Sequence, residues 1–258
     1  LREEYLSDYE ESEATQGFLN AVQNYPILQG MQTNLYKNFL PRAWSLESEI
    51  GATSFVHPDG IFDDPKGGEI RSNIYQRLRY HFQFHNELGL FPEAHHTNTF
   101  SINIYGRKGS KVKFDSISNL FDPKTIDECF QGDGKSTVPG IKDDNHEWNI
   151  RGHRDRVVKI DSDILSLFAD LYDDKEVGPL QARMPAVQST QVVRVLRLFA
   201  GQRKRLEDIQ GDVSMVEMWH ETNTQEAGII KQETKFPDSV DEWILSGPHF
   251  FVGTPLNK

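Results

Sequence analysis

The chain has 258 residues, of which 37% are hydrophobic, and carries a formal net charge of -11 with a single cysteine, Cys129. This hydrophobic content suffices for a packed core, and the lone cysteine excludes an internal disulfide and any zinc site built from several thiolates. The negative charge argues against a free-standing nucleic-acid binder, because affinity for nucleic acids depends on Lys and Arg side chains that neutralise phosphates.

The first part of the chain alternates between helical and strand patterns. Residues that repeat with helical or strand spacing fall in five segments: a helix within 31–51, a strand at 52–58, a helix at 69–78, and strands at 79–84 and 99–106. We expect Pro41 to break or kink the first helix and Gly51 to end it. The apolar run at 52–58 predicts a buried parallel strand.

The order helix, strand, helix, strand, strand is typical of one half of a doubly wound sheet. We therefore predict an α/β fold with a partial Rossmann-like sheet, of which this chain holds the C-terminal half. The glycine-rich turn GxGxxG is absent, and so is the phosphate-binding motif GxxxxGK[ST].

A boundary is predicted at GRKGSK, residues 106–111, where glycines, a serine and three basic residues interrupt the hydrophobic pattern. Residues 1–107 would then form the first unit and 108–258 an α+β second unit. The second unit's expected elements are helices at 161–172 and 189–201, capped by Asp161 or Ser162 and by Ser189, strands at 213–221 and 228–236, and a helix start at Ser239.

Several histidines and acidic residues raise the question of a metal site. His81, His85, His95 and His96 lie within 16 residues, but the last two are adjacent on a loop and are expected to point apart. We interpret these histidines as structural or solvent-facing and predict no metal site. The triplet ETK at 233–235 leaves a metal-dependent nuclease as an alternative. Cys129 is interpreted as a small, semi-buried apolar residue rather than a nucleophile.

The segment NELGLFPEAHH joins the two predicted strands and contains Phe91 directly before Pro92. A loop at the end of an α/β sheet can project an aromatic ring into the crevice beyond the strand ends, where such folds bind ligands. Bases rotated out of a duplex stack against such aromatic rings. Phe91 is therefore either a wall for a stacked base or an ordinary core residue.

Three segments resemble large bacterial adenine-specific (N6) DNA methyltransferases of the restriction-modification (type IIG-like) family: NLYKNFLPRAWSL, GATSFVHPDGIFDDPKGGEIRSNIYQRLRYHFQFHNELGLFPEAHHTNTFSINIYG and DEWILSGPHFFVGTPLNK. The resemblance is strongest from Gln32 to Gly106. In that family, the segment after the catalytic motif NPP[YFW] supplies a helix, a strand, another helix and a closing β-hairpin. The loop before the last strand carries an aromatic residue that packs on the flipped adenine, and Phe91 stands at the matching position.

The resemblance also implies what this chain lacks. The family binds S-adenosylmethionine through an early glycine-bearing strand-turn motif, and neither that motif nor NPP[YFW] occurs here. We therefore expect an internal fragment that does not bind the methyl donor and is inactive alone. Its expected partners are double-stranded DNA and a missing N-terminal half of the methyltransferase.

The remaining expectations concern surfaces and location. Basic residues that are candidates for phosphate contacts are Arg151, Arg154, Arg156, Arg203, Lys204 and Arg205. A non-catalytic DNA- or protein-interaction module is the competing interpretation. An incomplete sheet would expose an edge, which predicts self-association or strand swapping. No apolar run of about 18 residues and no signal peptide are visible, so we expect a cytoplasmic protein without a membrane partner.

Overall fold

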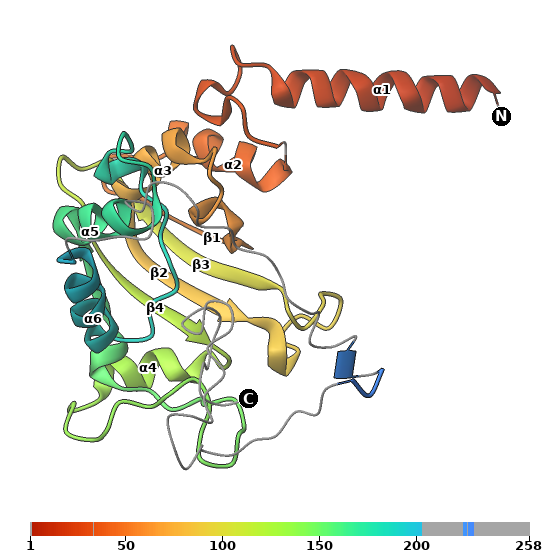
Figure 1. Cartoon of the computed structure of the whole chain (residues 1–258). Helices are drawn as coiled ribbons and strands as arrows, with labels where there is room; N and C mark the ends of the chain where they lie inside the picture. The colour runs from red at the N-terminus through yellow and green to blue at the C-terminus, as the bar shows by residue number, and fades with distance from the viewer. Residues whose placement is uncertain (1, 33, 203–223, 226, 230–258) are drawn as a thin grey trace, which may run out of the picture. The chain divides into compact units, whose positions relative to one another are not determined.

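A computed structural model describes residues 2–32, 34–202, 224–225 and 227–229. The chain divides into two compact units, Leu1–Gln202 and Arg203–Lys258. The first unit contains the helices α1 (Arg2–Asn20), α2 (Leu35–Ser45), α3 (Gly68–Tyr75), α4 (Lys124–Gln131), α5 (Ser162–Tyr172) and α6 (Thr190–Ala200). Its strands are β1 (Ala52–Pro58), β2 (Leu78–His85), β3 (Thr99–Gly106), β4 (Lys113–Leu120) and β5 (Val158–Asp161) (Figure 1).

The five strands form one mixed sheet with the order β1-β3-β2-β4-β5. Strand β3 is antiparallel to both β1 and β2, β4 is parallel to β2, and β5 is antiparallel to β4. Strands β1, β2 and β4 consequently run in the same direction and end at the same edge of the sheet. The predicted α/β class is confirmed.

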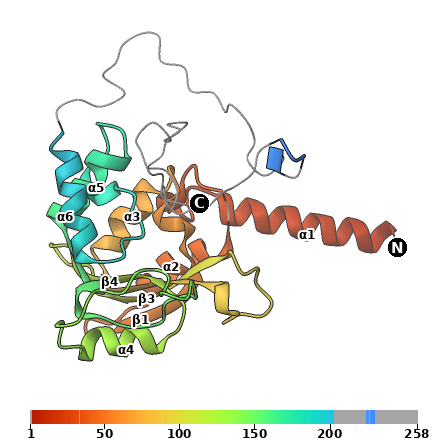
Figure 2. The same ribbon diagram turned by 60° about the horizontal axis from the view of Figure 1, so that its bottom comes forward.

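Helices cover both faces of the sheet (Figure 2). On one face, α2, α3, α5 and α6 enclose the larger core, which includes Ile70, Tyr75, Phe114 and Leu165. On the other face, α4 covers a smaller core around Phe84, in which Cys129 is fully buried. Burial raises the pKa of the Cys129 thiol, in keeping with its interpretation as a small apolar residue.

Strand β1 does not have the buried, parallel position that its apolar run predicts. Within the described residues it lies at the edge of the sheet and pairs only with the antiparallel β3, and it exposes alternate residues such as Ser54 and Val56. The prediction was wrong because a short apolar run does not distinguish a central strand from an edge strand that rests one face on helices.

The boundary predicted at residue 107 falls between two strands of a single sheet. Strand β4 pairs with β2 and strand β5 pairs with β4, so residues 113–161 extend the sheet that β1, β2 and β3 begin. The compact unit ends instead after Gln202. The glycines and bases of GRKGSK form a connection between β3 and β4, whose surface position suits that composition.

The helices agree with their sequence signals at most ends. Helix α5 begins after Asp161, whose Oδ1 accepts a hydrogen bond from the amide of Ile164 at 3.0 Å. Helix α6 runs between Ser189 and Gly201 as predicted. Helix α2 continues through Pro41 but ends at Ser45, short of Gly51. Within the described residues, no helix is both long and apolar enough to cross a membrane.

Candidate functional site at the carboxyl edge of the sheet

The segments that follow β1, β2 and β4 meet at one edge of the sheet, because these three strands run in the same direction. Strand β1 leads into Asp59, β2 into Asn86, and β4 ends beside Asn119. Ligands of α/β sheets bind in the crevice beyond the carboxyl ends of such strands. This edge is therefore the candidate functional site.

Asp59 anchors a buried polar cluster behind this edge. Its Oδ2 accepts a hydrogen bond from Gln83 Nε2 at 2.7 Å, and its Oδ1 lies 3.1 Å from His81 Nε2. Burial alone would raise the pKa of this carboxyl, but hydrogen bonds and attraction from His81, with further bonds from Gln83 and Ser101, lower it below 3.8. Asp59 is thus held as a carboxylate inside the fold.

His57 is held in the neutral form by its surroundings. Its Nδ1 lies 2.8 Å from the carbonyl oxygen of Pro58, which can only accept, so Nδ1 carries the proton. Its Nε2 is then the acceptor for Asn103 Nδ2 at 3.0 Å, and the Tyr105 hydroxyl lies 3.1 Å away. Burial lowers the pKa of His57 below 6.5, which agrees with a neutral imidazole.

A second chain of polar contacts runs along the end of β4. His85 Nε2 lies 3.0 Å from Asn119 Oδ1, and Asn119 Nδ2 donates to Gln188 Oε1 at 3.1 Å. Asn119 has a positive φ of 56°, a conformation that costs energy for a residue other than glycine. Such strain is stored where the surrounding contacts fix a residue in place, and it concentrates at functional sites.

Three aromatic rings and one lysine form a stack that begins at His85, near the end of β2. The ring of His85 stacks on Phe121 with centroids 5.6 Å apart, and Phe121 stacks on Trp148 at 4.7 Å. Lys142 Nζ lies 4.0 Å from the centroid of the Trp148 ring. The rings are therefore packed on one another, and Phe121, at the centre of the stack, is buried.

The loop between β2 and β3 is held by one buried side chain, Asn86. Its Nδ2 donates to the carbonyl oxygens of Phe91 at 2.8 Å and Ala94 at 2.9 Å, and its Oδ1 accepts from the amide of Phe91 at 2.9 Å. Gly89 takes the left-handed conformation with a φ of 67° where the loop turns. The backbone of Phe91 is thereby fixed from both sides.

The ring of Phe91 is 43% exposed and does not belong to either core. One side packs edge-on against Phe100 with ring centroids 4.8 Å apart. Of the two interpretations that the sequence left open for Phe91, the structure disfavours a sealed core residue. The ring is supported from behind and accessible from outside.

The predicted histidine positions are partly corrected. His95 and His96 do not point apart: their ring centroids lie 4.5 Å from each other, and both rings are on the exposed loop. His81 is buried in the cluster around Asp59. Among the described residues, no three His, Cys, Asp or Glu side chains form a group that could hold a metal ion. The ETK triplet at 233–235 lies outside the described residues.

The predicted phosphate-binding residues have different locations. Arg151 and Arg154 are exposed. Arg156 is fully buried and donates to the carbonyl oxygens of Ser118 and Asn119, both at 3.0 Å, so its guanidinium supports the end of β4 and is not available to a phosphate. Arg203, Lys204 and Arg205 lie outside the described residues.

Sequence reasoning missed the cluster around Asp59, His57 and Asn103. The available signal was the polar alternation within SINIYG, where Ser101, Asn103 and Tyr105 share one face of β3. All three point into the fold, where a solvent-facing row was the simpler expectation. Comparison with protein-family models and with curated proteins finds no match for this chain.

Proposed function

We propose that this chain forms part of a DNA adenine-N6 methyltransferase and supplies one wall of the pocket that receives the target adenine. The observation that carries the proposal is the Phe91 ring, which is half exposed, supported by Phe100 and fixed by Asn86 at the carboxyl edge of the parallel strands. The resemblance to restriction-modification methyltransferases places the base-stacking aromatic at this same position.

The arrangement of elements supports the same proposal. Helix α2, strand β1, helix α3 and the hairpin of β2 and β3 follow one another in the order that the family's core has after its catalytic motif. Strand β1 has no partner on its outer side among the described residues. The remaining strands of a methyltransferase sheet would pair along this open edge, which would make the missing half the chain's first partner.

The described residues do not fit the methyl donor S-adenosylmethionine by themselves. Its recognition needs a glycine-bearing turn directly after a strand, whereas β1 is followed by a 3-10 helix, Asp59–Phe62, in which Asp59 and Phe62 are buried in packing contacts. The role proposed for this chain therefore concerns the target base.

Phe91 can act on a base only by stacking, because it carries no hydrogen-bonding group. A base rotated out of the duplex would lose its neighbours in the stack, and the exposed face of the ring would replace one of them. The fixed backbone of Phe91 means that little conformational entropy is lost when the base docks.

The test uses the 258-residue chain and a duplex in which 2-aminopurine stands opposite an abasic site, so that no base pair opposes rotation of the fluorescent base out of the helix. Stacking on Phe91 should quench the 2-aminopurine emission. Phe91→Ala should weaken binding about 10-fold and abolish the quenching, since one base-aromatic stack contributes about 1–3 kcal/mol. Phe91→Trp should retain both.

Leu90→Ala is the matched control, because Leu90 is an exposed apolar residue of the same loop. Equal losses for Leu90→Ala and Phe91→Ala would show that the loop contributes only apolar area and would remove the proposed stacking role. Unaltered binding in Phe91→Ala would do the same.

A further inference from the structure

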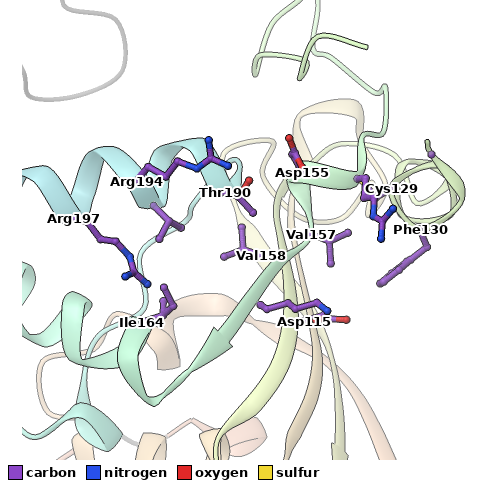
Figure 3. A pocket seen from close by; sticks show the side chains of 14 residues that line it. Asp115, Cys129, Phe130, Asp155, Val157, Val158, Ile164, Thr190, Arg194 and Arg197 are labelled. Carbon is purple, nitrogen blue, oxygen red and sulfur yellow. The ribbon is translucent and has the colours of Figure 1, made fainter. Parts of the chain in front are cut away.

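A basic groove lies at the β5 edge of the sheet. It has a volume of about 870 Å³ and is bounded by α6 on one side and α4 on the other, with β5 between them. Figure 3 shows Arg194 and Arg197 projecting from α6, Phe130 on the opposite side, and Val157 and Val158 between them. The groove therefore combines an apolar floor with a charged rim.

The rim is positively charged although the chain as a whole is strongly acidic. Its basic residues are Arg154, Lys159, Arg194 and Arg197, against the acidic pair Asp115 and Asp155. Within the part of the chain that the structure describes, none of these four basic side chains forms an ion pair. Unpaired cations beside an apolar floor suit an occupant that is both acidic and amphipathic.

The first half of helix α1 is acidic and carries a short apolar stripe. The helix is 19 residues long and has no buried residue, although Tyr5, Leu6 and Tyr9 lie on one side of it. Tyr5 is 67% exposed, and its ring stacks on Tyr9. The acidic residues of its first half are Glu3, Glu4, Asp8, Glu10, Glu11 and Glu13.

Helix α1 buries none of its residues, so its apolar stripe contributes little packing. Most helical stability in proteins comes from packing of an apolar face and not from intrinsic propensity. At helical spacing, the arc from Tyr5 through Tyr9 to Leu6 also contains Glu13, and it is flanked by Asp8 on one side and Glu10 on the other. The stripe and its flanks match the apolar floor and basic rim of the groove.

We propose that α1 of one copy of this chain docks in the basic groove of a second copy. DNA fits the groove less well, because a phosphate backbone has no apolar stripe to cover Val157, Val158 and Phe130. The inference is independent of the proposed methyltransferase role.

The occupant comes from a second copy because of where α1 is attached. Asn38 Nδ2, on α2, donates to the carbonyl oxygen of Leu19 at 3.1 Å and so ties the end of α1 to α2. Helix α2 packs beside β1, whereas the groove lies at β5, the opposite edge of the five-stranded sheet. Two copies that exchange α1 would form a closed dimer with two equivalent contacts.

Sedimentation velocity of the full chain tests the proposal, with a concentration-dependent monomer-dimer equilibrium as the expected result. Two charge reversals should each weaken the dimer at least about 100-fold, because they place like charges in contact. These are Arg194→Glu with Arg197→Glu in the groove, and Glu10→Lys with Glu13→Lys on α1.

Mixing the two double variants provides the decisive measurement. Each variant alone opposes like charges, but in the mixed dimer both α1-groove contacts are again complementary, so the mixture should dimerise. Glu11→Lys, on the opposite side of α1, and Arg42→Glu, exposed on α2, are the matched controls and should dimerise normally.

Three outcomes would overturn the proposal. The first is a monomer at every concentration. The second is a dimer that the α1 variant does not weaken, which would mean that another segment occupies the groove or forms the interface. The third is a groove variant that loses duplex DNA binding while its self-association is unchanged, which would make the groove a nucleic-acid site.

Discussion

Replacing Asp59 by Asn should destabilise the protein strongly although the two side chains have nearly the same shape. In the native protein both carboxylate oxygens accept hydrogen bonds, one from Gln83 Nε2 at 2.7 Å and one from the His81 ring at 3.1 Å. Asparagine offers one acceptor and one amino group. With the asparagine oxygen toward Gln83, the amino group faces His81 Nε2, and the ring can accept it only with its own proton on Nδ1, facing Ser116. In the reverse orientation, the amino groups of the asparagine and Gln83 face each other.

The size of the effect follows from what is lost. A hydrogen bond to a charged group contributes about 1.5–3 kcal/mol, and a buried donor left without its acceptor costs about 1–3 kcal/mol, so the expected loss is about 3–5 kcal/mol. For a unit of about 200 residues, each kcal/mol lowers Tm by about 2–4 °C. A decrease in Tm of roughly 10 °C is therefore expected.

Thermal and urea unfolding followed by circular dichroism measures this decrease. Asp63→Asn is the matched control, because Asp63 is exposed, lies four positions further along the chain, and makes no side-chain hydrogen bond in the described structure. The reasoning is refuted if Asp59→Asn costs no more stability than Asp63→Asn. A gain in stability would show that burying the Asp59 carboxylate destabilises the folded protein.

Three further predictions follow from other contacts. Asn86→Asp replaces the buried donor that holds the Phe91 loop by an acceptor that faces carbonyl oxygens, so amide exchange in the loop should accelerate, 2-aminopurine quenching should fall and Tm should decrease; unchanged exchange would exclude the clamp. Arg156→Lys should cost about 2–3 kcal/mol in urea unfolding, because lysine cannot reproduce the fork of the guanidinium, and a smaller loss than at an exposed arginine would contradict this. The pKa of His57 is below 6.5 in the folded protein, so on acidification the unfolded chain binds a proton before the folded protein does. The free energy of unfolding should therefore be highest above about pH 6.5 and decrease as the pH falls from there. His57→Gln should flatten this decrease, and a free energy of unfolding that rises on acidification would refute the prediction.

The parts of the fold that the sequence predicted correctly are those with local periodicity. Helices α3, α5 and α6 have apolar residues at helical spacing, and β3 alternates between a buried and a half-buried face. Each of these signals depends on neighbours within one element, so it can be recognised without the tertiary structure.

Strand β4 was missed because its inward residues are partly polar. Ser116 is buried where it meets the His81 ring, with its hydroxyl 2.9 Å from Nδ1, and Ser118 is buried next to it. A serine in a strand pattern normally indicates a solvent-facing position, and only the partner on β2 explains its burial. Without β4, the sheet was expected to end at residue 106.

The candidate site was predictable only in its loop. Phe91 and its turn are adjacent in sequence, so their pattern can be recognised locally. Arg156 shows why the rest could not be, since GHRDRVVK has the composition of a surface loop and yet places one guanidinium under the end of β4. A buried charge of this kind is specified by carbonyl groups 37 and 38 residues away.

The position of β3 between β1 and β2 also has a consequence for synthesis of the chain. Strands β1 and β2 leave the ribosome before β3, yet they have no hydrogen bonds to each other and reach their places in the sheet only when β3 enters between them. Until residue 106 has emerged, the nascent chain carries two strands whose edges are open to other polypeptides. Chaperone demand during translation should therefore peak before this point, and pausing of the ribosome just upstream of it should lower the yield of folded protein.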